Sequence, residues 1–349
     1  MKVSRVFLII FVTFMFVTLF MPVVKIIAKH IGAIDMPNAR KVHKKAIPRL
    51  GGLGIYFGFL LGFVLFGHQS VQMNSILIGS FIIVITGIID DIKPIPAKYK
   101  LIGQIIGASV IPVVGGIALR DVSAFGIYIN FGFLSYLVTI IFIVAIINCI
   151  NLIDGLDGLA GGLAAIYFAM IGVIAILFNN SSGLDTILTF VMLGCTLGFL
   201  VHNFYPATIF MGDSGSMFLG YIIAVIALLG YKNVTFTSLI VPIFMLAIPI
   251  MDTLFAIIRR FLKGESISKG DSYHIHHQLL RRNLSVKQTV LIIYLVDILF
   301  ASASIIYILK DRYLGYIIYG ILLALVIVFV INTNVIYDFK DSSKEKKHE

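Results

Sequence analysis

Asparagine, aspartate and glycine are concentrated between Asn148 and Gly162, in a stretch with strongly apolar sequence on both sides. Polar groups left unpaired in hydrocarbon are costly, so a polar stretch between two membrane spans indicates a functional site. Glycine lets the backbone approach a ligand closely or adopt a positive φ. The alternative interpretation is a connecting loop in which an aspartate caps a helix and the glycines turn the chain.

Further carboxylates occur at Asp90-Asp91 and at Asp213. Adjacent carboxylates repel each other, which raises at least one pKa or requires a cation, although a solvated helix end would also explain the pair. Asp213 lies in a Gly-Asp-Ser-Gly segment, just before a helix that we expect to begin near Ser216. Asp and Ser are favoured helix caps, but the free N–H groups of a helix start also suit a phosphate. A carboxylate beside a bound phosphate is a place where Mg²⁺ is held.

Three histidines, His274, His276 and His277, lie in the longest polar connection of the chain. They could bind a transition metal, but neither a cysteine nor an obvious fourth ligand accompanies them. Neighbouring lysines and arginines favour contact with phosphate instead.

Two aspartates fall inside predicted spans. Asp252 lies about two turns before Arg259, which favours an ion pair or a capping role for it. Asp297 lies near the middle of its span and requires a buried partner, because a carboxylate in hydrocarbon is costly.

The composition is that of an integral membrane protein. Of 349 residues, 59% are hydrophobic and only 13% are charged, and the mean hydropathy is +1.03. Apolar segments of about 20 residues indicate helices rather than a barrel. The net charge of +10 lies in loops between spans, so lipid headgroups and anionic ligands are expected partners and nucleic acid is not. Cys149 and Cys195 both lie in apolar segments, which argues against a disulfide.

Eleven spans are expected, in one membrane domain covering residues 1–339 with a charged tail at 340–349. A small hairpin is expected at 120–131. The first span is retained as an anchor because no cleavage site follows it. The spans lie at about 6–27, 51–67, 75–89, 99–118 and 133–151, then one ending near 178, one ending near 201, one starting near 216, and finally about 235–258, 288–309 and 315–332.

The basic residues predict the orientation. Of the 27 lysines and arginines, 21 fall on one side of these spans and 6 on the other. The side rich in lysine and arginine is normally cytoplasmic, which places the N-terminus outside and the C-terminus inside. The polar clusters described above all fall on the cytoplasmic side. The sequence therefore predicts an all-α polytopic bundle with one composite active site at the cytoplasmic face of the membrane.

The motifs together resemble those of the polyprenyl-phosphate N-acetylhexosamine-1-phosphate transferases. They occur in order over nearly the whole chain, and the combination is highly specific. The His-x-His-His form is similar to the branch that uses UDP-GlcNAc, whereas the branch that uses UDP-MurNAc-pentapeptide more often has three consecutive histidines. The matching segments are Asp90-Asp91-x-Lys93, Asn148-x-x-Asn151-x-x-Asp154-Gly155-x-Asp157-Gly158, Asn203 ahead of Phe210-Met211-Gly212-Asp213-x-Gly215-Ser216, His274-x-His276-His277, and Arg40-Lys41-x-His43 followed by Pro48-Arg49-x-Gly51-Gly52.

The resemblance implies transfer of N-acetylglucosamine 1-phosphate from UDP-GlcNAc to undecaprenyl phosphate, with Mg²⁺ and with Mn²⁺ as a substitute. A metal and cationic side chains must offset the charge when one phosphate attacks another. The implied catalytic residues are Asp90, Asp91 and Asp213, and the implied metal ligands are Asp213 and Asp154. The implied substrate-binding residues are Asn151, Asp154, Asp157, Asn203 and Phe210 at the uridine, Lys93, His274, His276 and His277 at the phosphates or sugar, and also Arg40, Lys41 and His43.

Three other functions account for part of this pattern. A transferase for UDP-MurNAc-pentapeptide belongs to the same family. A transporter would also explain intramembrane carboxylates, but its site would lie near the midplane, and no internal repeat is visible here. A membrane scaffold or sensor would explain the basic loops but not the carboxylates. The product glycan, such as teichoic acid or O-antigen, a one-step or two-step mechanism, and a homodimer are left open by the sequence.

Overall fold

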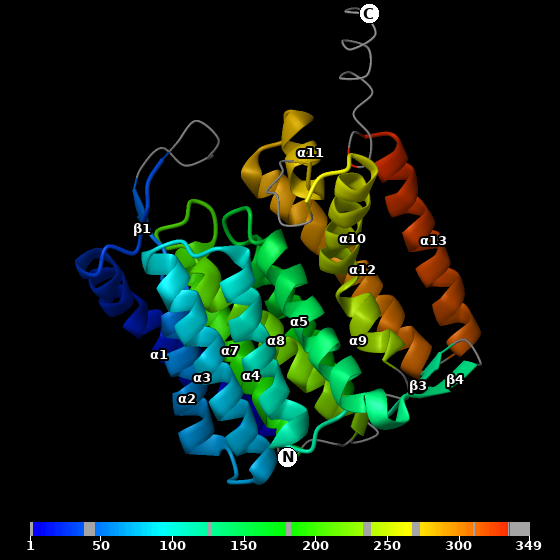
Figure 1. Cartoon of the computed structure of the whole chain (residues 1–349), viewed down its shortest axis with the longest axis horizontal. Coiled ribbons are helices and arrows are strands. Elements are labelled where there is room, and N and C mark those ends of the chain that lie inside the picture. Colours follow the sequence, from blue (N-terminus) through cyan, green and yellow to red (C-terminus); the bar gives the residue numbers. More distant parts are fainter. Residues whose placement is uncertain are drawn as a thin grey trace, which may run out of the picture.

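The computed structural model describes residues 3–37, 46–124, 127–178, 183–232, 239–266, 273–309, 311–333 and 335. They form a bundle of helices with a short strand pair at each end (Figure 1). The helices are α1 (Val3–His30), α2 (Gly51–Phe66), α3 (Val71–Ile92), α4 (Ala97–Val113), α5 (Ser135–Ile153), α6 (Leu159–Leu177), α7 (Leu184–Asn203), α8 (Gly212–Lys232), α9 (Ile240–Met245), α10 (Ala247–Leu262), α11 (Ile275–Arg281), α12 (Val286–Leu309) and α13 (Arg312–Ile331), with a 3₁₀ turn η1 (Gly132–Leu134) before α5.

Among the described residues, eight helices are long and apolar enough to cross a membrane. This confirms the expectation of an all-α polytopic membrane protein. The shorter α2, α4 and α10 contain 16, 17 and 16 residues. The number of eleven crossings, their direction and the domain boundaries stay predictions, and the tail at 340–349 lies outside the described residues.

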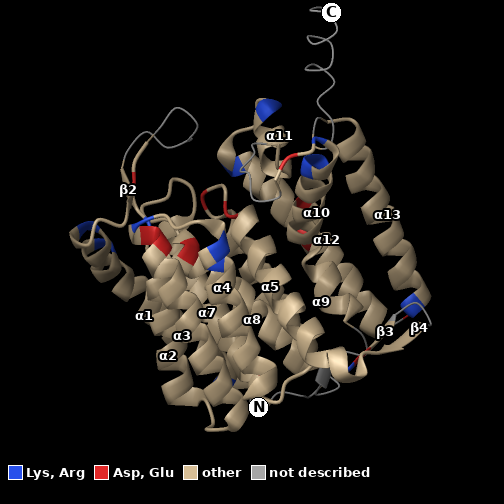
Figure 2. Cartoon of the chain, in the orientation of Figure 1, with Lys and Arg blue, Asp and Glu red and all other residues tan. Residues whose placement is uncertain are grey.

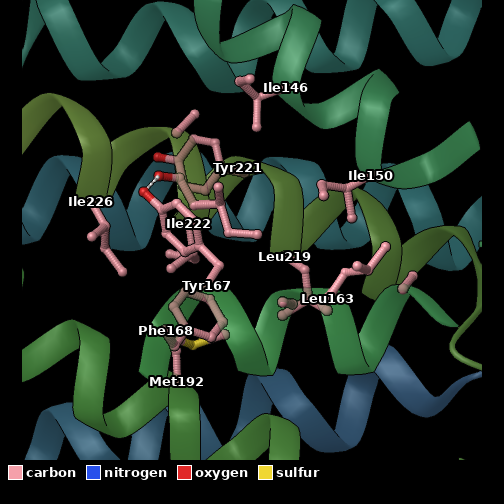
Figure 3. Packing of buried hydrophobic residues seen from close by; sticks show 14 of the residues in the cluster. Ile146, Ile150, Leu163, Tyr167, Phe168, Met192, Leu219, Tyr221, Ile222 and Ile226 are labelled. Carbon is pink, nitrogen blue, oxygen red and sulfur yellow. Dashed lines mark hydrogen bonds between the residues drawn. The ribbon is translucent and has the colours of Figure 1, made fainter. Parts of the chain in front are cut away.

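The helix α8 forms the centre of the bundle. In an 18-residue apolar segment of α8, 89% of the residues are buried inside the protein, compared with 17% in α13. The helix α8 is therefore surrounded by protein, and α13 faces outward. Small residues permit this packing, as they do in other membrane bundles. A Cβ atom on Gly220 would lie 2.6 Å from the Cα of Ile147, so α5 and α8 approach backbone to backbone. Figure 3 shows Tyr167 and Tyr221 packed among the isoleucines and leucines of this core.

The predicted span at about 235–258 is not one continuous helix. Its described part forms two helices, α9 and α10, which are separated at Leu246. Pro249 lies in the first turn of α10, where its missing N–H group is tolerated. The same proline could not continue α9, because it has no N–H group for the carbonyl of Met245. The sequence prediction of an unbroken span was therefore wrong here.

Two short strand pairs join the helices. At one end, β1 (Ile34–Asp35) pairs with β2 (Ile47–Pro48), and at the other end β3 (Asp121–Ala124) pairs with β4 (Ile127–Asn130). The second pair confirms the hairpin predicted at 120–131. Just after β2, Arg49 forms a β-bridge to Phe210. This bridge ties the segment before α2 to the segment before α8.

Three further expectations can be compared with the structure. Cys149 and Cys195 are buried and unpaired, as predicted. The helix α8 begins at Gly212, four residues earlier than expected, so Asp213 lies inside its first turn. Asp297 is 1% exposed, and neither carboxylate oxygen has a hydrogen-bond partner among the described residues, so the buried partner that we expected is not found.

Candidate active site

A cleft of about 760 Å³ opens at one end of the bundle. Figure 2 shows acidic and basic residues gathered at this end, above the apolar helices. The lining comes from the β1–β2 region, α4, the α5–α6 and α7–α8 connections, α11 and the start of α12. It consists of Asp35, Ile47, Arg49, Lys100, Asn151, Asp154, Gly155, Leu156, Asp157, Asn203, Tyr205, Pro206, Ala207, Phe210, Met211, Gly212, Asp213, His277 and Val286.

Asp91 of α3 caps the first turn of α8. Its carboxylate accepts hydrogen bonds from the backbone N–H of Asp213 at 2.8 Å and from the N–H and hydroxyl of Ser214 at 3.1 and 2.6 Å. Gly212 adopts φ +72°, and a Cβ atom there would lie 2.4 Å from Asp91 Oδ2. Only glycine suits both this φ and this close approach. The segment Gly212-Asp213-Ser214 is therefore suited to bind the carboxylate of Asp91, which lies on a helix distant in sequence.

The carboxylates of Asp90 and Asp213 share one ammonium. Lys100 Nζ lies 2.7 Å from Asp213 Oδ2 and 2.9 Å from Asp90 Oδ2. The other oxygen of Asp90 accepts a hydrogen bond from the backbone N–H of Ile95 at 2.9 Å. Asp90 is 3% exposed, so this charge is paired in a nearly solvent-free position.

Arg49 lies on the other side of Asp213. Its Nη2 atom lies 3.3 Å from Asp91 Oδ1 and 3.7 Å from Asp213 Oδ1, and its Nη1 atom lies 3.8 Å from Asp35 Oδ1. The side chain of Asp213 keeps 15% of its surface exposed, whereas that of Asp91 keeps none. Of the carboxylates of Asp91 and Asp213, that of Asp213 is therefore the one that can reach a ligand in the cleft.

Asp154 is another of the carboxylates that line the cleft. Burial, together with the nearby charges of Asp213 and Asp91, raises the pKa of Asp154 to about 7. A cation held between Asp154 and Asp213 would relieve this repulsion. Within the described residues, no three acidic, histidine or cysteine side chains form a complete metal-binding cluster. The residues present fit Mg²⁺, which takes one or two carboxylates and completes its shell with phosphate oxygens and water.

Asp157 and Asn203 join the α5–α6 and α7–α8 connections. Asp157 Oδ2 accepts a hydrogen bond from the N–H of Ala207 at 2.9 Å. Asn203 accepts from the N–H of Gly158 at 3.0 Å and donates to the carbonyl of Ile209 at 2.9 Å. The amide of Asn203 is 3% exposed and committed to these two bonds. Asn203 therefore shapes the cleft wall by holding both loops.

Beneath the cleft, a polar group links α4, α5 and α8. Asn148 Nδ2 donates to Gln104 Oε1 at 2.8 Å, and Gln104 Nε2 lies 3.3 Å from Met217 Sδ. These residues lie about one helical turn deeper than Asn151, Lys100 and Asp213 on the same three helices. The polar group therefore fixes the relative positions of the helices that carry cleft residues.

The chain is similar in sequence to known proteins. Residues 73–231 match the model of glycosyl transferase family 4. A probable undecaprenyl-phosphate N-acetylglucosaminyl 1-phosphate transferase of Bacillus subtilis is 40% identical over 309 residues, which cover 87% of this chain and 86% of the relative. The chain belongs to glycosyl transferase family 4.

Two further relatives of this glycosyl transferase family 4 protein are more distant. A decaprenyl-phosphate N-acetylglucosaminephosphotransferase of Mycobacterium tuberculosis H37Rv is 34% identical, and the match covers 78% of this chain and 75% of the relative. An undecaprenyl-phosphate alpha-N-acetylglucosaminyl 1-phosphate transferase of Escherichia coli K12 is 32% identical, with 84% and 81% covered. Family membership, which was expected from the motifs, is confirmed.

The three histidines of this family member have different surroundings. His277 lines the cleft. His274 Nδ1 lies 2.7 Å from Asp252 Oδ2, and Asp252 Oδ1 accepts from the N–H of Ile275 at 2.7 Å, at the start of α11. Asp252 thus caps α11. The capping role predicted for Asp252 is therefore found, at the start of α11.

His276 packs against the α5–α6 connection instead of lining the cleft. A Cβ atom on Gly155 would lie 2.4 Å from His276 Nε2. The imidazole is 1% exposed, and within the described part of the chain neither ring nitrogen has a hydrogen-bond partner. Burial lowers the pKa of His276 to about 3. Glycine at position 155 is therefore needed to admit this neutral ring.

The structure brings most of the predicted site residues of the glycosyl transferase family 4 protein to one place. Lys93 is exposed at the end of α3 and does not line the cleft, and Arg40, Lys41 and His43 lie outside the described residues. Sequence reasoning gave no role to Lys100 or Arg49. One feature of the sequence could have indicated a role for Lys100. It lies near the start of a helix, and a short turn separates that helix from Asp90-Asp91.

Proposed function

We propose that this protein transfers N-acetylglucosamine 1-phosphate from UDP-GlcNAc to undecaprenyl phosphate, with release of UMP. The observation that supports the proposal is the group formed by Lys100, Asp90 and Asp213 at the floor of a cleft in a membrane bundle. The names of the relatives, which describe polyprenyl-phosphate N-acetylglucosamine 1-phosphate transferases, support the same substrates.

The reaction forms one P–O bond and breaks another. An oxygen of the lipid phosphate attacks the phosphorus that carries the sugar, and the bond from this phosphorus to the bridging oxygen breaks. UMP leaves with the electron pair of that bond. Both reactants are anions, so charge compensation is the main requirement placed on the protein.

Lys100 and Arg49 supply cationic charge where the phosphates meet. Each is already in contact with Asp213, at 2.7 and 3.7 Å, and both line the cleft. Asp90 orients the ammonium of Lys100 toward the lipid phosphate. A lipid phosphate is largely ionised near pH 7, so removal of its proton by Asp90 makes a small contribution.

Asp213 and Asp154 are the proposed Mg²⁺ ligands. When bound, the ion would neutralise phosphate charge and polarise the phosphoryl oxygens. Asp91 holds the first turn of α8 and so fixes the direction of the Asp213 side chain. The Asp213→Asn protein should stay folded but lose turnover at any practical Mg²⁺ concentration. Activity within about tenfold of wild type would exclude Asp213 as the essential ligand.

The uridine is proposed to lie between Phe210 and the α5–α6 connection, with Asp157 and Asn203 shaping the wall. His277 lies at the α11 side of the cleft, which is consistent with a contact to the donor sugar or diphosphate. We place the cleft on the cytoplasmic side of a bacterial plasma membrane, where sugar nucleotides are available, with the N-terminus outside. The excess of lysine and arginine at that side supports this orientation.

A direct assay tests the proposed function. Purified protein in nanodiscs is given undecaprenyl phosphate, Mg²⁺ and either UDP-GlcNAc or UDP-MurNAc-pentapeptide, and UMP release is measured. We expect turnover of UDP-GlcNAc and none of the pentapeptide donor. Efficient use of the pentapeptide donor would assign the protein to the other branch of the family, and no UMP release with either donor would overturn the proposal.

A further inference from the structure

Three cations surround one tyrosine ring where α10 ends and α11 begins. The charged groups of Arg259, Lys263 and Arg281 lie 5.5, 5.1 and 4.6 Å from the centre of the Tyr273 ring. A cation within about 6 Å of the centre of an aromatic ring is attracted by the electrons of its face, so these four residues form one cluster. None of these four residues lines the catalytic cleft.

The charge of this region exceeds what its own acids can neutralise. Between positions 259 and 287 the chain has seven basic residues and two acidic residues, Glu265 and Asp271. Arg259 is buried and donates hydrogen bonds to the backbone carbonyls of Tyr273 and Val335. Lys263 and Arg281 are exposed at the surface, so an anion from outside can reach both side chains.

The cluster lies at the level where the apolar helices end. Arg282, next to Arg281, donates to the carbonyl of Asn332, the residue that caps α13. Its guanidinium lies 5.3 Å from the ring centre of Phe329, in the last turn of the same helix. The apolar stretch of α13 therefore ends at the height of this cluster, which corresponds to the headgroup region of a bilayer.

Apolar side chains are exposed directly beside the cations. Phe261 and Leu262 precede Lys263 in the last turn of α10 and are 80% and 61% exposed. Exposed apolar groups next to basic groups at a membrane boundary match a lipid, which offers acyl chains and a phosphate together. A soluble anion would use the cations but leave Phe261 and Leu262 in water.

We propose that Lys263, Arg281 and Tyr273, with Phe261 and Leu262, form a binding site for an anionic diacyl phospholipid. The phosphate would lie between the ammonium of Lys263 and the guanidinium of Arg281. The acyl chains would run along Phe261 and Leu262. Because His277 of the cleft lies one turn before Arg281 on α11, an occupied site would also hold α11 at the membrane surface.

The test compares lipid retention by matched variants. The full-length protein is placed in phosphatidylcholine nanodiscs with a minor fraction of phosphatidylglycerol. Native mass spectrometry then counts the phospholipid molecules that stay bound after the protein is released from the nanodisc. The variants are the double substitution Lys263→Gln/Arg281→Gln, the charge-preserving Lys263→Arg/Arg281→Lys, and Lys29→Gln. Lys29 is an exposed lysine in the last turn of α1, so it controls for a general loss of surface charge.

Retention of phosphatidylglycerol should fall about tenfold or more in the neutral double variant, because both basic groups near the anionic headgroup lose their charge. It should stay near wild type in the other two variants, and wild-type retention should fall as salt rises. Equal losses in the Lys29→Gln protein would overturn the proposal. Unchanged retention in the double variant, with a raised KM for undecaprenyl phosphate or for UDP-GlcNAc, would assign the cluster to a substrate and overturn it as well.

If the neutral double variant does not fold, wild-type protein still gives an answer. Photoreactive phosphatidylglycerol in the same nanodiscs should cross-link to peptides within 259–282, and unlabelled phosphatidylglycerol should compete while inorganic phosphate should not. Competition by inorganic phosphate, or cross-links only to other parts of the chain, would contradict the phospholipid site.

Discussion

The ammonium of Lys100 lies 2.7 Å from Asp213 Oδ2, although the two residues are 113 positions apart in the chain. The same ammonium lies 2.9 Å from Asp90, on the preceding helix α3. One lysine on α4 thus connects the carboxylate proposed to bind the metal with the carboxylate proposed to face the lipid phosphate. The first prediction follows from this arrangement.

Replacement of Lys100 by Gln should lower kcat by about 10²–10³-fold, because a charged group directed at developing phosphate charge contributes on that scale. The KM for UDP-GlcNAc should change much less. Steady-state UMP release measures both. Lys98→Gln is the matched control, since Lys98 is exposed on the same helix and contacts only the Tyr99 ring among the interactions described, so it should keep near wild-type activity. Similar kcat values for Lys100→Gln and wild type would remove Lys100 from the mechanism.

Phe210→Ala should weaken donor binding by about 1–3 kcal/mol, the contribution of one base–aromatic stack. The backbone of Phe210 is held by the carbonyl of Pro48 and the N–H of Gly51, so removal of the ring should leave the loop in place. Calorimetric titration with UDP-GlcNAc measures the loss, and the KM for undecaprenyl phosphate should be unaffected. An unchanged Kd for the donor would exclude stacking on Phe210.

The polar group beneath the cleft allows a double-variant experiment. Gln104→Leu leaves one N–H group of the Asn148 amide without a partner, while the other keeps the carbonyl of Val144, and the unpaired group should destabilise the protein by about 1–3 kcal/mol. Gln104→Leu/Asn148→Leu replaces both partners and should recover most of that stability. We expect kcat to stay reduced in the double variant with the KM values unchanged, because α4 and α5 lose the contact that positions Lys100 and Asn151.

Thermal unfolding in detergent and UMP release provide the two readouts for the Gln104 and Asn148 variants. Recovery of kcat together with stability in the double variant would show that the polar group is only structural.

The protonation of His276 predicts a loss of stability in acid. In the folded protein its pKa is about 3, below the ordinary value of about 6.5, so the unfolded chain takes up a proton that the folded chain does not. The neutral imidazole of His276 makes its full contribution to the free energy of unfolding above pH 6.5. This contribution is lost as the pH falls below that value, by about 1.4 kcal/mol per pH unit. Apparent unfolding midpoints between pH 7.5 and 5 should therefore fall more steeply for wild type than for His276→Gln. Parallel curves would contradict the buried neutral imidazole.

The sequence by itself determined the class of the protein and the identity of most polar groups in the cleft. Long apolar segments leave the backbone no alternative to helices in a membrane, so the all-α bundle could be predicted from composition and the length of the apolar segments. The segments with Asp90-Asp91, Asp154, Asp157 and Asp213 could be recognised because carboxylates beside membrane spans are rare and costly. The break between α9 and α10 was missed, since prolines in an apolar run, here Pro242 and Pro249, are compatible with either outcome.

Only the tertiary structure decided which side chains meet. Asp91 proved to cap α8, Asn203 to fasten two loops, and Asp252 to hold His274, because pairing depends on how helices far apart in sequence pack. Lys100 and Arg49 acquired roles for the same reason. A lysine near a helix start looks like any other loop cation in the sequence, and its position 2.7 Å from Asp213 arises from the packing of α3 and α4 beside α8.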